Sequence, residues 1–381
     1  MTKRLSQTLR RRQAGRKRYG LYLGDLDRTT TDSQGIFNYA IGLARNLPEA
    51  LQADETLVLY VNPALAPEFL SLSNLIIRVM PPPRNRLQRL MNDQLSWFWA
   101  KRDRLDVMHY PKGFIPLRIG KGPKVVATLH DDIVFQYAAG RWLHPNPLKV
   151  RFFARLARRT LRNADVIMTV SETSGARLRE WARSFGRKIE PVVTLVGPTA
   201  MANLGGARRG DPYFLVVGSE LPHKRTKEAV AFTERLINDN GMEARILVLG
   251  SDFPAEAKRA ERVAGPIAND AMAELMSDAR AVITGSEYEG FGLVPLDAHI
   301  ALTPAVFADN DAAQELYSDL PGIFRVGEYE GFKDAMRRVT ELEAADLLHI
   351  AESLKATFTW SRITEVIANT YRDAASRKYG E

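Results

Sequence analysis

Short runs of apolar and β-branched residues alternate with longer amphipathic stretches along the chain. This alternation is typical of parallel sheets whose strands are joined by crossover helices. Strands are predicted in the first half at residues 19–24, 57–61, 75–79, 107–110, 125–129, 166–170 and 192–196. Helices are predicted between them at residues 35–46, 86–101, 148–162 and 174–184. The first half therefore predicts one α/β domain.

The pattern stops at residues 197–212, a segment rich in glycine and alanine that indicates a linker, and then restarts. Strands are predicted at residues 213–217, 245–249, 262–264, 281–284, 305–308 and 323–326. Helices are predicted at residues 226–239, 269–277, 292–301, 311–317, 330–340 and 360–372. Two such units predict two Rossmann-like domains, 19–196 and 213–359. Ligands of such sheets bind at the carboxyl ends of the strands, so we expect the site in a cleft between the domains.

The composition narrows the class of protein. The 381 residues are 45% apolar and 26% charged, which is ordinary for a soluble enzyme of two domains. No apolar run approaches the roughly 20 residues of a membrane-spanning helix, and the N-terminus lacks the apolar core of a secretory signal. The chain has no cysteine, which excludes disulfides and thiol chemistry. We therefore expect a cytoplasmic location.

Positive charge is concentrated at the N-terminus. The net charge is +8, and residues 1–18 hold eight basic residues and no acidic one: Lys3, Arg4, Arg10, Arg11, Arg12, Arg16, Lys17 and Arg18. The rest of the chain has 45 basic and 45 acidic residues. We predict a disordered tail that either binds an anionic membrane surface or is simply solvated. A transit peptide and a nucleic-acid partner fit less well.

Several common site signatures are absent. No G-x-G-x-x-G follows a strand, and no P-loop or G-x-S-x-G is present, which argues against dinucleotide and P-loop chemistry and against a nucleophile elbow. The six histidines do not have metal-ligand spacing. Two D-x-D triplets, Asp25-Leu26-Asp27 and Asp309-Asn310-Asp311, fall at predicted strand ends, where turn and cap residues are common. We therefore predict no metal site and no cofactor.

The strongest candidate site follows the predicted strand at 281–284. Glu289-Gly290-Phe291-Gly292-Leu293 opens a helix that also carries Asp297. Glycines let the backbone approach a ligand, and the free N–H groups of a helix start favour an anion. Carboxylates accept hydrogen bonds from hydroxyls, so this segment suits a nucleotide-sugar. The alternative is an acidic loop that merely caps a helix.

A basic segment, His223-Lys224-Arg225, follows the first predicted strand of the second half. Preorganised cations stabilise the charge that develops on a departing nucleoside diphosphate. The alternative is a solvated basic turn. Because the first candidate segment already suits a nucleotide-sugar, the interpretation as a diphosphate site is favoured here, with Lys224 as its main residue.

These segments resemble the retaining family-four glycosyltransferases, whose signature is a glutamate, seven residues and a second glutamate. Here Glu289 begins the signature and Asp297 replaces the second glutamate. Leu302 stands where the family usually has glycine, and His223 where its phosphate-binding loop has arginine. The resemblance covers about residues 20–372. It implies a GT-B fold, with two Rossmann-like domains facing across a cleft and the C-terminal segment 360–381 crossing back to the first domain.

The resemblance also implies roles for these residues. Lys224 and the helix start at Gly290, Phe291, Gly292 and Leu293 would hold the diphosphate, with His223 or Arg225 helping. Asp297 would bind the ribose, and Glu289 would bind hydroxyls of the transferred sugar.

Two first-half segments extend this resemblance. Gly35, within Thr31–Tyr39, resembles the glycine-rich entry to the first helix, close to donor and acceptor. His130, within Leu129–Asp132, resembles the family's histidine beside the transferred sugar. A lone His-Asp at a strand end is alternatively a capping pair.

Two predicted helices concern the acceptor. Residues 84–104 and 149–162 interleave basic residues with leucine and aromatic residues. Each fits a helix on a membrane surface beside a lipid-linked acceptor, and equally a core helix with a solvated basic face.

The sequence thus predicts a retaining, metal-independent hexosyltransferase of polysaccharide or glycoconjugate synthesis. Its donor would be a GDP-, UDP- or dTDP-sugar and its acceptor a saccharide or lipid-linked saccharide. Peripheral contact with the inner face of an anionic membrane is expected through residues 3–18 and 84–104. A nucleotide-sugar epimerase and a non-catalytic nucleotide-sugar or polyanion-binding protein remain alternatives.

Overall fold

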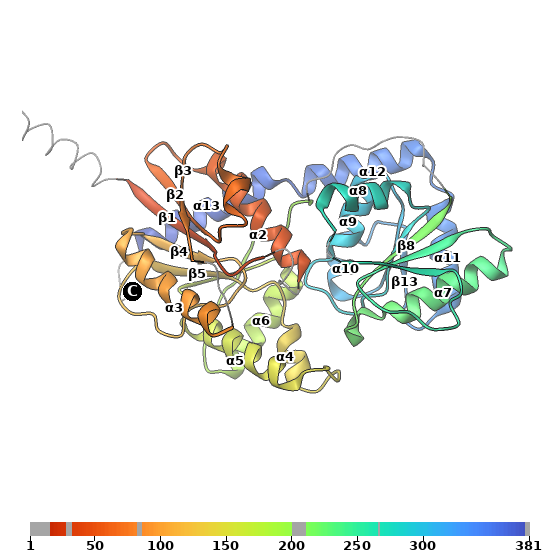
Figure 1. Ribbon diagram of the computed structural model, residues 1–381, viewed down its shortest axis with the longest axis horizontal. Coiled ribbons are helices and arrows are strands. Elements are labelled where there is room, and N and C mark those ends of the chain that lie inside the picture. Colours follow the sequence, from red (N-terminus) through yellow and green to blue (C-terminus); the bar gives the residue numbers. More distant parts are fainter. Residues whose placement is uncertain (1–15, 28–32, 82–85, 200–210, 266, 378–381) are drawn as a thin grey trace, which may run out of the picture.

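Two parallel sheets covered by helices form the two lobes of the protein (Figure 1). The computed structural model describes residues 16–27, 33–81, 86–199, 211–265 and 267–377. Most of the predicted basic tail and most of the predicted linker lie outside these residues. No helix within the described ranges is long and apolar enough to cross a membrane.

The first sheet has seven parallel strands in the order β3-β2-β1-β4-β5-β6-β7. The strands are β1 (Lys17–Leu23), β2 (Glu55–Val61), β3 (Leu75–Val79), β4 (Val107–Tyr110), β5 (Lys124–Thr128), β6 (Val166–Thr169) and β7 (Val192–Val193). The helices of this domain are α2 (Gln34–Asn46), α3 (Arg86–Arg102), α4 (Ile133–Ala138), α5 (Pro147–Asn163) and α6 (Glu172–Ser184). All four residues of β4 are buried, as expected for a strand covered on both faces.

The second sheet has six parallel strands in the order β10-β9-β8-β11-β12-β13. The strands are β8 (Tyr213–Val217), β9 (Arg245–Leu249), β10 (Ala260–Val263), β11 (Val282–Thr284), β12 (Ala305–Ala308) and β13 (Ile323–Phe324). The helices are η3 (Pro222–Lys224, a 3-10 turn), α7 (Thr226–Asp239), α8 (Asn269–Asp278), α9 (Leu293–Ile300), α10 (Asp311–Tyr317), α11 (Tyr329–Thr340) and α12 (Ala344–Thr357). The strand order reverses between β8 and β11, and ligands of open α/β sheets bind at such a switch point.

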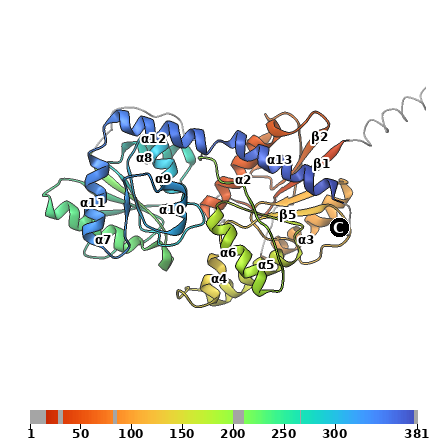
Figure 2. The ribbon, with the colours of Figure 1, turned by 180° about the vertical axis from the view of Figure 1, so that it is seen from behind.

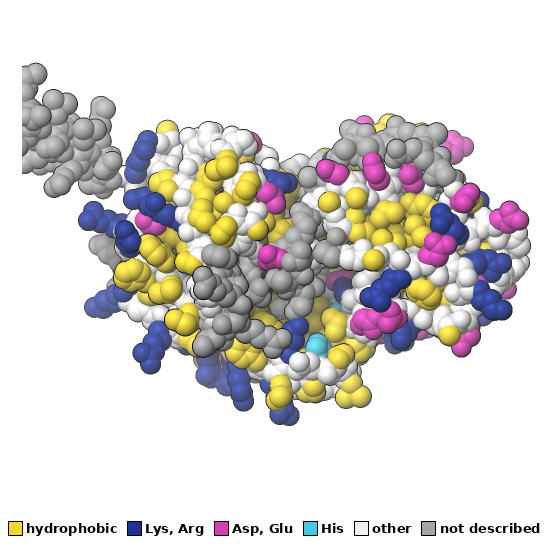
Figure 3. Space-filling model, viewed as in Figure 1, with side chains coloured by type: hydrophobic (Ala, Val, Ile, Leu, Met, Phe, Trp, Pro, Cys, Tyr) yellow, Lys and Arg dark blue, Asp and Glu magenta, His cyan; other side chains and the backbone are white. Residues whose placement is uncertain are grey.

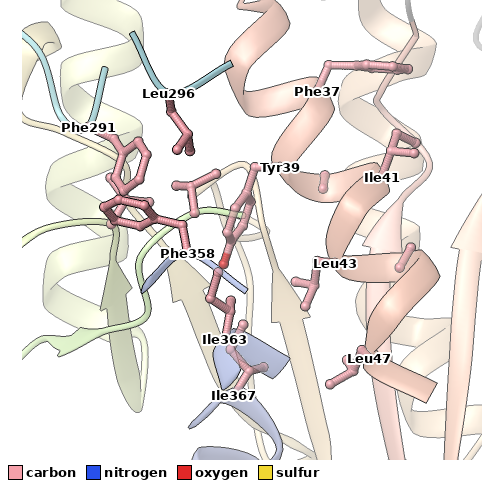
Figure 4. Close-up of a cluster of buried hydrophobic side chains, with 14 of the residues drawn as sticks. Phe37, Tyr39, Ile41, Leu43, Leu47, Phe291, Leu296, Phe358, Ile363 and Ile367 are labelled. Carbon is pink, nitrogen blue, oxygen red and sulfur yellow. The ribbon is translucent and has the colours of Figure 1, made fainter. Parts of the chain in front are cut away.

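One hydrophobic cluster runs from the first domain into the second. It includes Phe37 and Tyr39 of α2, Phe291 and Leu296 at the start of α9, and Phe358 (Figure 4). The rings of Phe291 and Phe358 meet edge to face with centroids 5.4 Å apart. The two domains therefore share a core.

The last helix, α13 (Trp360–Ser376), returns to the first domain along the back of the molecule (Figure 2). The Tyr371 hydroxyl lies 2.6 Å from His109 Nδ1, and Arg372 donates to both carboxylate oxygens of Glu55. Burial lowers the pKa of His109 to about 3, so its ring is neutral. Helix α13 is thus anchored to the first sheet by buried polar contacts.

The structure contains each predicted strand and helix within a few residues of its predicted bounds. It adds α4 and α12, which the sequence analysis did not predict. The start of α5 follows from its sequence, since Pro147 occupies the first turn and the Asn146 side chain accepts a hydrogen bond from Lys149 N at 2.9 Å.

Candidate functional site

Lys224 and Glu289 form an ion pair at the switch point of the second sheet. Lys224 follows β8 and Glu289 follows β11, which are adjacent parallel strands, so the residues after them meet at one sheet edge. The Lys224 Nζ–Glu289 Oε1 distance is 2.6 Å. Burial alone would raise the pKa of Glu289, but the Lys224 ammonium outweighs this and lowers the pKa below its ordinary value. Glu289 is therefore ionised at neutral pH.

First-domain residues lie directly against this loop. A Cβ atom placed on Gly290 would lie 2.3 Å from the His130 carbonyl oxygen, so no other residue fits here without movement. The Gly290 carbonyl accepts hydrogen bonds from Ser171 Oγ at 2.6 Å and Ser174 Oγ at 3.2 Å. The structure therefore brings His130 of the first domain beside Glu289 of the second.

The His130 ring is held in one orientation. Its Nε2 donates to the Pro111 carbonyl at 2.8 Å, and the ring meets Tyr39 edge on with centroids 4.8 Å apart. Burial lowers the pKa of His130 to about 4, and the bond to Pro111 only partly opposes this. A neutral ring that donates through Nε2 presents Nδ1 as an acceptor, which suits a sugar hydroxyl.

The neighbours of Lys224 have partners of their own. His223 is buried, and its Nδ1 lies 2.8 Å from the Tyr137 hydroxyl of the first domain. Burial and then the Lys224 charge lower the pKa of His223 to about 4, so this ring is neutral near pH 7. Arg225 pairs with Glu287 at 2.8 Å and with Glu228 at 3.2 Å. Lys224 is thus the cation of this segment that contacts Glu289.

Two helix starts approach each other at the site. A Cβ atom placed on Gly35 at the start of α2 would lie 3.5 Å from Leu293 Cδ1 at the start of α9. Gly292 precedes α9 with φ +89°, a conformation that favours glycine. Phe291 packs into the shared core between them. The positive ends of two helices therefore converge, an arrangement that favours an anionic ligand.

Asp297 binds the connection between the domains. It sits within α9, is 8% exposed, and its Oδ1 accepts from the Thr199 backbone N–H at 3.0 Å. Burial raises the pKa of Asp297 to about 7, and the bonds from Thr199 only partly lower it. Its carboxyl group contacts the start of the connection between the domains.

Asp131 and Asp132 are residues that the sequence analysis did not assign. Burial, and then the charges of Asp132 and Glu289, raise the pKa of Asp131 to about 6, while Lys224 lowers it. Asp132 is fully buried and accepts from the Tyr288 hydroxyl of the second domain at 2.7 Å. Their signal in the sequence is two consecutive acids after a buried strand, a pattern that capping also explains.

A small pocket opens beside Glu289 at the ends of β11 and β12. Its lining includes Ser286, Phe291, Gly292, Asn310 and Tyr317. A larger cavity, about 280 Å³, lies between α13 and the β6–β7 edge, and none of its lining residues is a predicted site residue. Within the described residues no group of three or more histidine or acidic side chains is arranged to hold a metal ion.

Comparison with known proteins identifies the first domain. Residues 33–192 match the family model described as Glycosyltransferase Family 4. The N-terminal domain is a Glycosyltransferase Family 4 domain. This match confirms the predicted family and the enzyme class, glycosyltransferase. It includes Gly35 and His130 and ends before Lys224 and Glu289. No curated protein matches the chain.

Solved structures confirm the GT-B fold. Sucrose-phosphate synthase from Thermosynechococcus elongatus is 19% identical, with a TM-score of 0.64 over 94% of this chain and 99% of that one. A glycosyltransferase from Rickettsia africae is 13% identical, with a TM-score of 0.63 over 95% and 100% of the two chains. AviGT4, a glycosyltransferase involved in avilamycin A biosynthesis, is 15% identical, with a TM-score of 0.63 over 95% and 99%.

Proposed function

We propose that this glycosyltransferase moves a hexose, with retention of anomeric configuration and without a metal ion, from a nucleoside-diphosphate-sugar to a saccharide or lipid-linked saccharide. The observation that carries the proposal is the Lys224–Glu289 ion pair at 2.6 Å, which lies at the strand ends where the second sheet would bind a nucleotide. A GDP-, UDP- or dTDP-sugar is the donor class, and the products feed polysaccharide or glycoconjugate synthesis.

The positions of the site residues support one set of roles. Lys224 and the converging starts of α2 and α9 stabilise the charge that forms on the diphosphate when the bond from sugar C1 to phosphate oxygen breaks. Glu289 and His130 Nδ1 accept hydrogen bonds from sugar hydroxyls, and Asp297 takes the ribose. The acceptor oxygen bonds to C1 on the face that the diphosphate leaves, and a leaving-group oxygen takes the acceptor proton. Because Lys224 supplies the positive charge, the proposal needs no metal ion.

The experiment begins with thermal shifts of the full chain in UDP, GDP, ADP and dTDP. The corresponding glucose donors are then incubated with EDTA, with and without a panel of oligosaccharides and lipid extracts. We expect one diphosphate to stabilise the protein and its donor to be consumed only with an acceptor, yielding the retained anomer by NMR. Donor conversion without acceptor would indicate an epimerase, and stabilisation without turnover would indicate a binding protein. Either result would reject the proposal.

An anionic membrane surface is part of the same proposal, as the partner of a cytoplasmic, peripheral enzyme. Lysine and arginine side chains line the outer and lower edges of the first lobe (Figure 3). Helix α5 holds six basic residues and no acidic one, and also exposes Leu148 at 76% and Phe152 at 42%. Helix α3 exposes Met91 at 55% and Phe98 at 59%.

The segment that holds Phe114 and Arg118 contacts both of these helices. Arg118 N donates to Gln94 of α3 at 3.2 Å, and the Phe114 and Phe153 rings lie 5.2 Å apart. Exposed apolar side chains among basic ones favour insertion at an anionic interface. The predicted contribution of residues 3–15 lies outside the described residues.

Vesicle sedimentation tests this partner. Wild-type protein is expected to sediment with phosphatidylglycerol-rich vesicles and not with pure phosphatidylcholine. Arg151→Glu combined with Arg155→Glu should reduce the bound fraction severalfold, because each basic residue near an anionic surface contributes about 1 kcal/mol. Lys227→Glu combined with Lys333→Glu, exposed in the second domain, is the matched control. Equal loss in both pairs would show that α5 is not the contact.

A further inference from the structure

Tyr288, between β11 and α9 of the second domain, is held by a carboxylate of the first domain. Its hydroxyl donates to Asp132 Oδ1 at 2.7 Å. The other oxygen of Asp132 accepts from Trp181 Nε1 at 2.9 Å and from Gln136 Nε2 at 2.6 Å. Asp132 is therefore fixed within its own domain by one oxygen and binds across the interface with the other.

The Tyr288 ring also fits into a socket of first-domain side chains. The guanidinium groups of Arg177 and Arg141 lie over the ring, 3.9 and 4.8 Å from its centroid, and Trp142 meets it edge on at 5.4 Å. Trp142 Nε1 donates to Glu287 at 2.6 Å, beside Tyr288. Cations over an aromatic face attract it, so the socket favours this ring in its closed position.

The residues on both sides of Glu289 contact the first domain. Tyr288 on one side is bound by Asp132, and the Gly290 carbonyl on the other side accepts from two serines of the first domain. The Glu289 carbonyl itself accepts from Arg177 at 3.3 Å. The loop that carries Glu289 is thus held beside His130 by hydrogen bonds between the two domains.

We propose that Asp132 is a positioning residue that closes the two domains on Tyr288 and thereby places Glu289 opposite His130. Only the role of Glu289 in this proposal rests on the proposed function. Domain closure itself is measured without substrate, so a failure of this proposal is distinguishable from a failure of the proposed function.

Two backbone amides report on closure. The N–H groups of Glu172 and Thr173, at the start of α6, donate across the interface to the Glu315 carboxylate at 2.8 and 2.7 Å. When the domains separate, these amides lose their acceptor and exchange with solvent. Hydrogen–deuterium exchange of the full chain therefore follows even rare openings.

The variant is Tyr288→Phe, which keeps the ring and removes the hydroxyl. Its matched control is Tyr329→Phe, since the Tyr329 hydroxyl donates to Asp239 at 2.7 Å under Arg235 at 3.7 Å, wholly inside the second domain. Loss of a hydrogen bond to a charged group should speed exchange at 172–173 about tenfold. Amides of β8 should stay unchanged, which shows that the fold is intact.

The control variant should leave exchange at 172–173 unchanged, and Asp132→Ala, which removes the acceptor from the other side of the interface, should speed exchange at least as much as Tyr288→Phe. Unchanged exchange at these amides in Tyr288→Phe, or equal acceleration in Tyr329→Phe, would overturn the proposal.

Discussion

Lys224 and Glu289 balance each other's charge at the centre of the site. In the proposed function, a donor diphosphate brings further negative charge to a place where Glu289 is already ionised, so the ammonium is needed most when the leaving group forms. The shared core does not include Lys224, which lies at the surface of the site. Its replacement should therefore alter catalysis more than folding.

Lys224→Ala is expected to lower turnover more than tenfold, because removal of one preorganised transition-state partner typically costs a factor of about 100 or more. The loss of the ammonium also leaves Glu289 unpaired, so its pKa should rise and residual activity should shift to higher pH. Initial rates across pH, with circular dichroism for the fold, measure both effects. Lys227→Ala, on the exposed face of α7, is the control and should match wild type. Unchanged turnover would remove Lys224 from the diphosphate site.

Asp297 couples the stability of the protein to pH. Its folded pKa of about 7 lies above the ordinary unfolded value of about 3.9, so the folded state binds this proton more tightly. The resulting stabilisation is complete below about pH 4 and is lost as pH rises toward 7. Asp297→Asn removes this dependence and keeps an oxygen acceptor for Thr199.

Asp297→Asn is expected to gain stability relative to wild type as the pH rises from 5 to 8. The difference in the free energy of unfolding should grow by up to a few kcal/mol, and the difference in melting temperature should grow with it. Thermal unfolding at these two pH values measures the difference. Asp319→Asn, an exposed position, is the control and should show no such trend. A pH-independent difference at position 297 would mean that burial does not raise the pKa of this carboxyl group.

At the scale of elements, the loop between β11 and α9 packs closely against the first domain because Gly290 has no side chain. A methyl group there would meet the His130 carbonyl oxygen at 2.3 Å and Asp131 Cβ at 3.1 Å. Backbone cannot yield as a flexible side chain can, so the loop itself would have to move away. That movement would carry Glu289 with it.

Gly290→Ala is therefore expected to reduce turnover at least tenfold while leaving affinity for the free diphosphate within about threefold, since the proposed function assigns most of the diphosphate contacts to Lys224 and the start of α9. Steady-state kinetics and calorimetric titration separate the two effects. Gly120→Ala is the control, because a Cβ atom there meets nothing within 4 Å. Equal turnover in the two variants would show that the first domain does not restrain this loop.

The elements themselves were largely predictable from sequence. β4 is buried on both faces and is apolar apart from His109, and Gly292 marks the start of α9. Helix α4 was not predicted because its six residues span less than two turns and show no clear period. Helix α12, by contrast, has a full helical length but buries only Ala351 and Leu354, so its sequence carries a weak apolar period.

The site was only partly predictable, for a physical reason. Local patterns place Lys224 and Glu289 after strands, and strand adjacency then brings them together. Two partners of Asp132, Trp181 and Tyr288, lie 49 and 156 residues away, and no local pattern encodes such pairs. The neutral state of His223 likewise follows from burial beside Tyr137, which only the fold reveals.

At the scale of the whole molecule, the chain crosses between the domains twice, after β7 and at the start of α13. Trp360 begins α13 and also contacts the first connection. Its Nε1 donates to the Pro198 carbonyl at 3.0 Å, where the first connection leaves β7. A Cβ atom on Gly42 of α2 would lie 2.1 Å from the Trp360 ring, and one on Gly197 would lie 2.5 Å from it. Helix α13 thus begins with a side chain wedged between α2 and the connection.

This wedge should make the two domains unfold together. The shared core runs through α2, α9 and α13, so separation of the domains exposes apolar surface of both. We expect wild-type protein to show one calorimetric transition. Trp360→Ala should cost about 3 kcal/mol and divide this transition into two, one for each domain.

The control is Trp99→Ala, since Trp99 packs against a cluster confined to the first domain, with Arg102 over its ring at 5.0 Å. Its loss should lower the transition temperature without dividing the transition, because the contacts between the domains remain. Differential scanning calorimetry of both variants makes the comparison. A single transition in Trp360→Ala would show that the shared core couples the domains without this side chain, and the wedge would then serve only the local packing of α13.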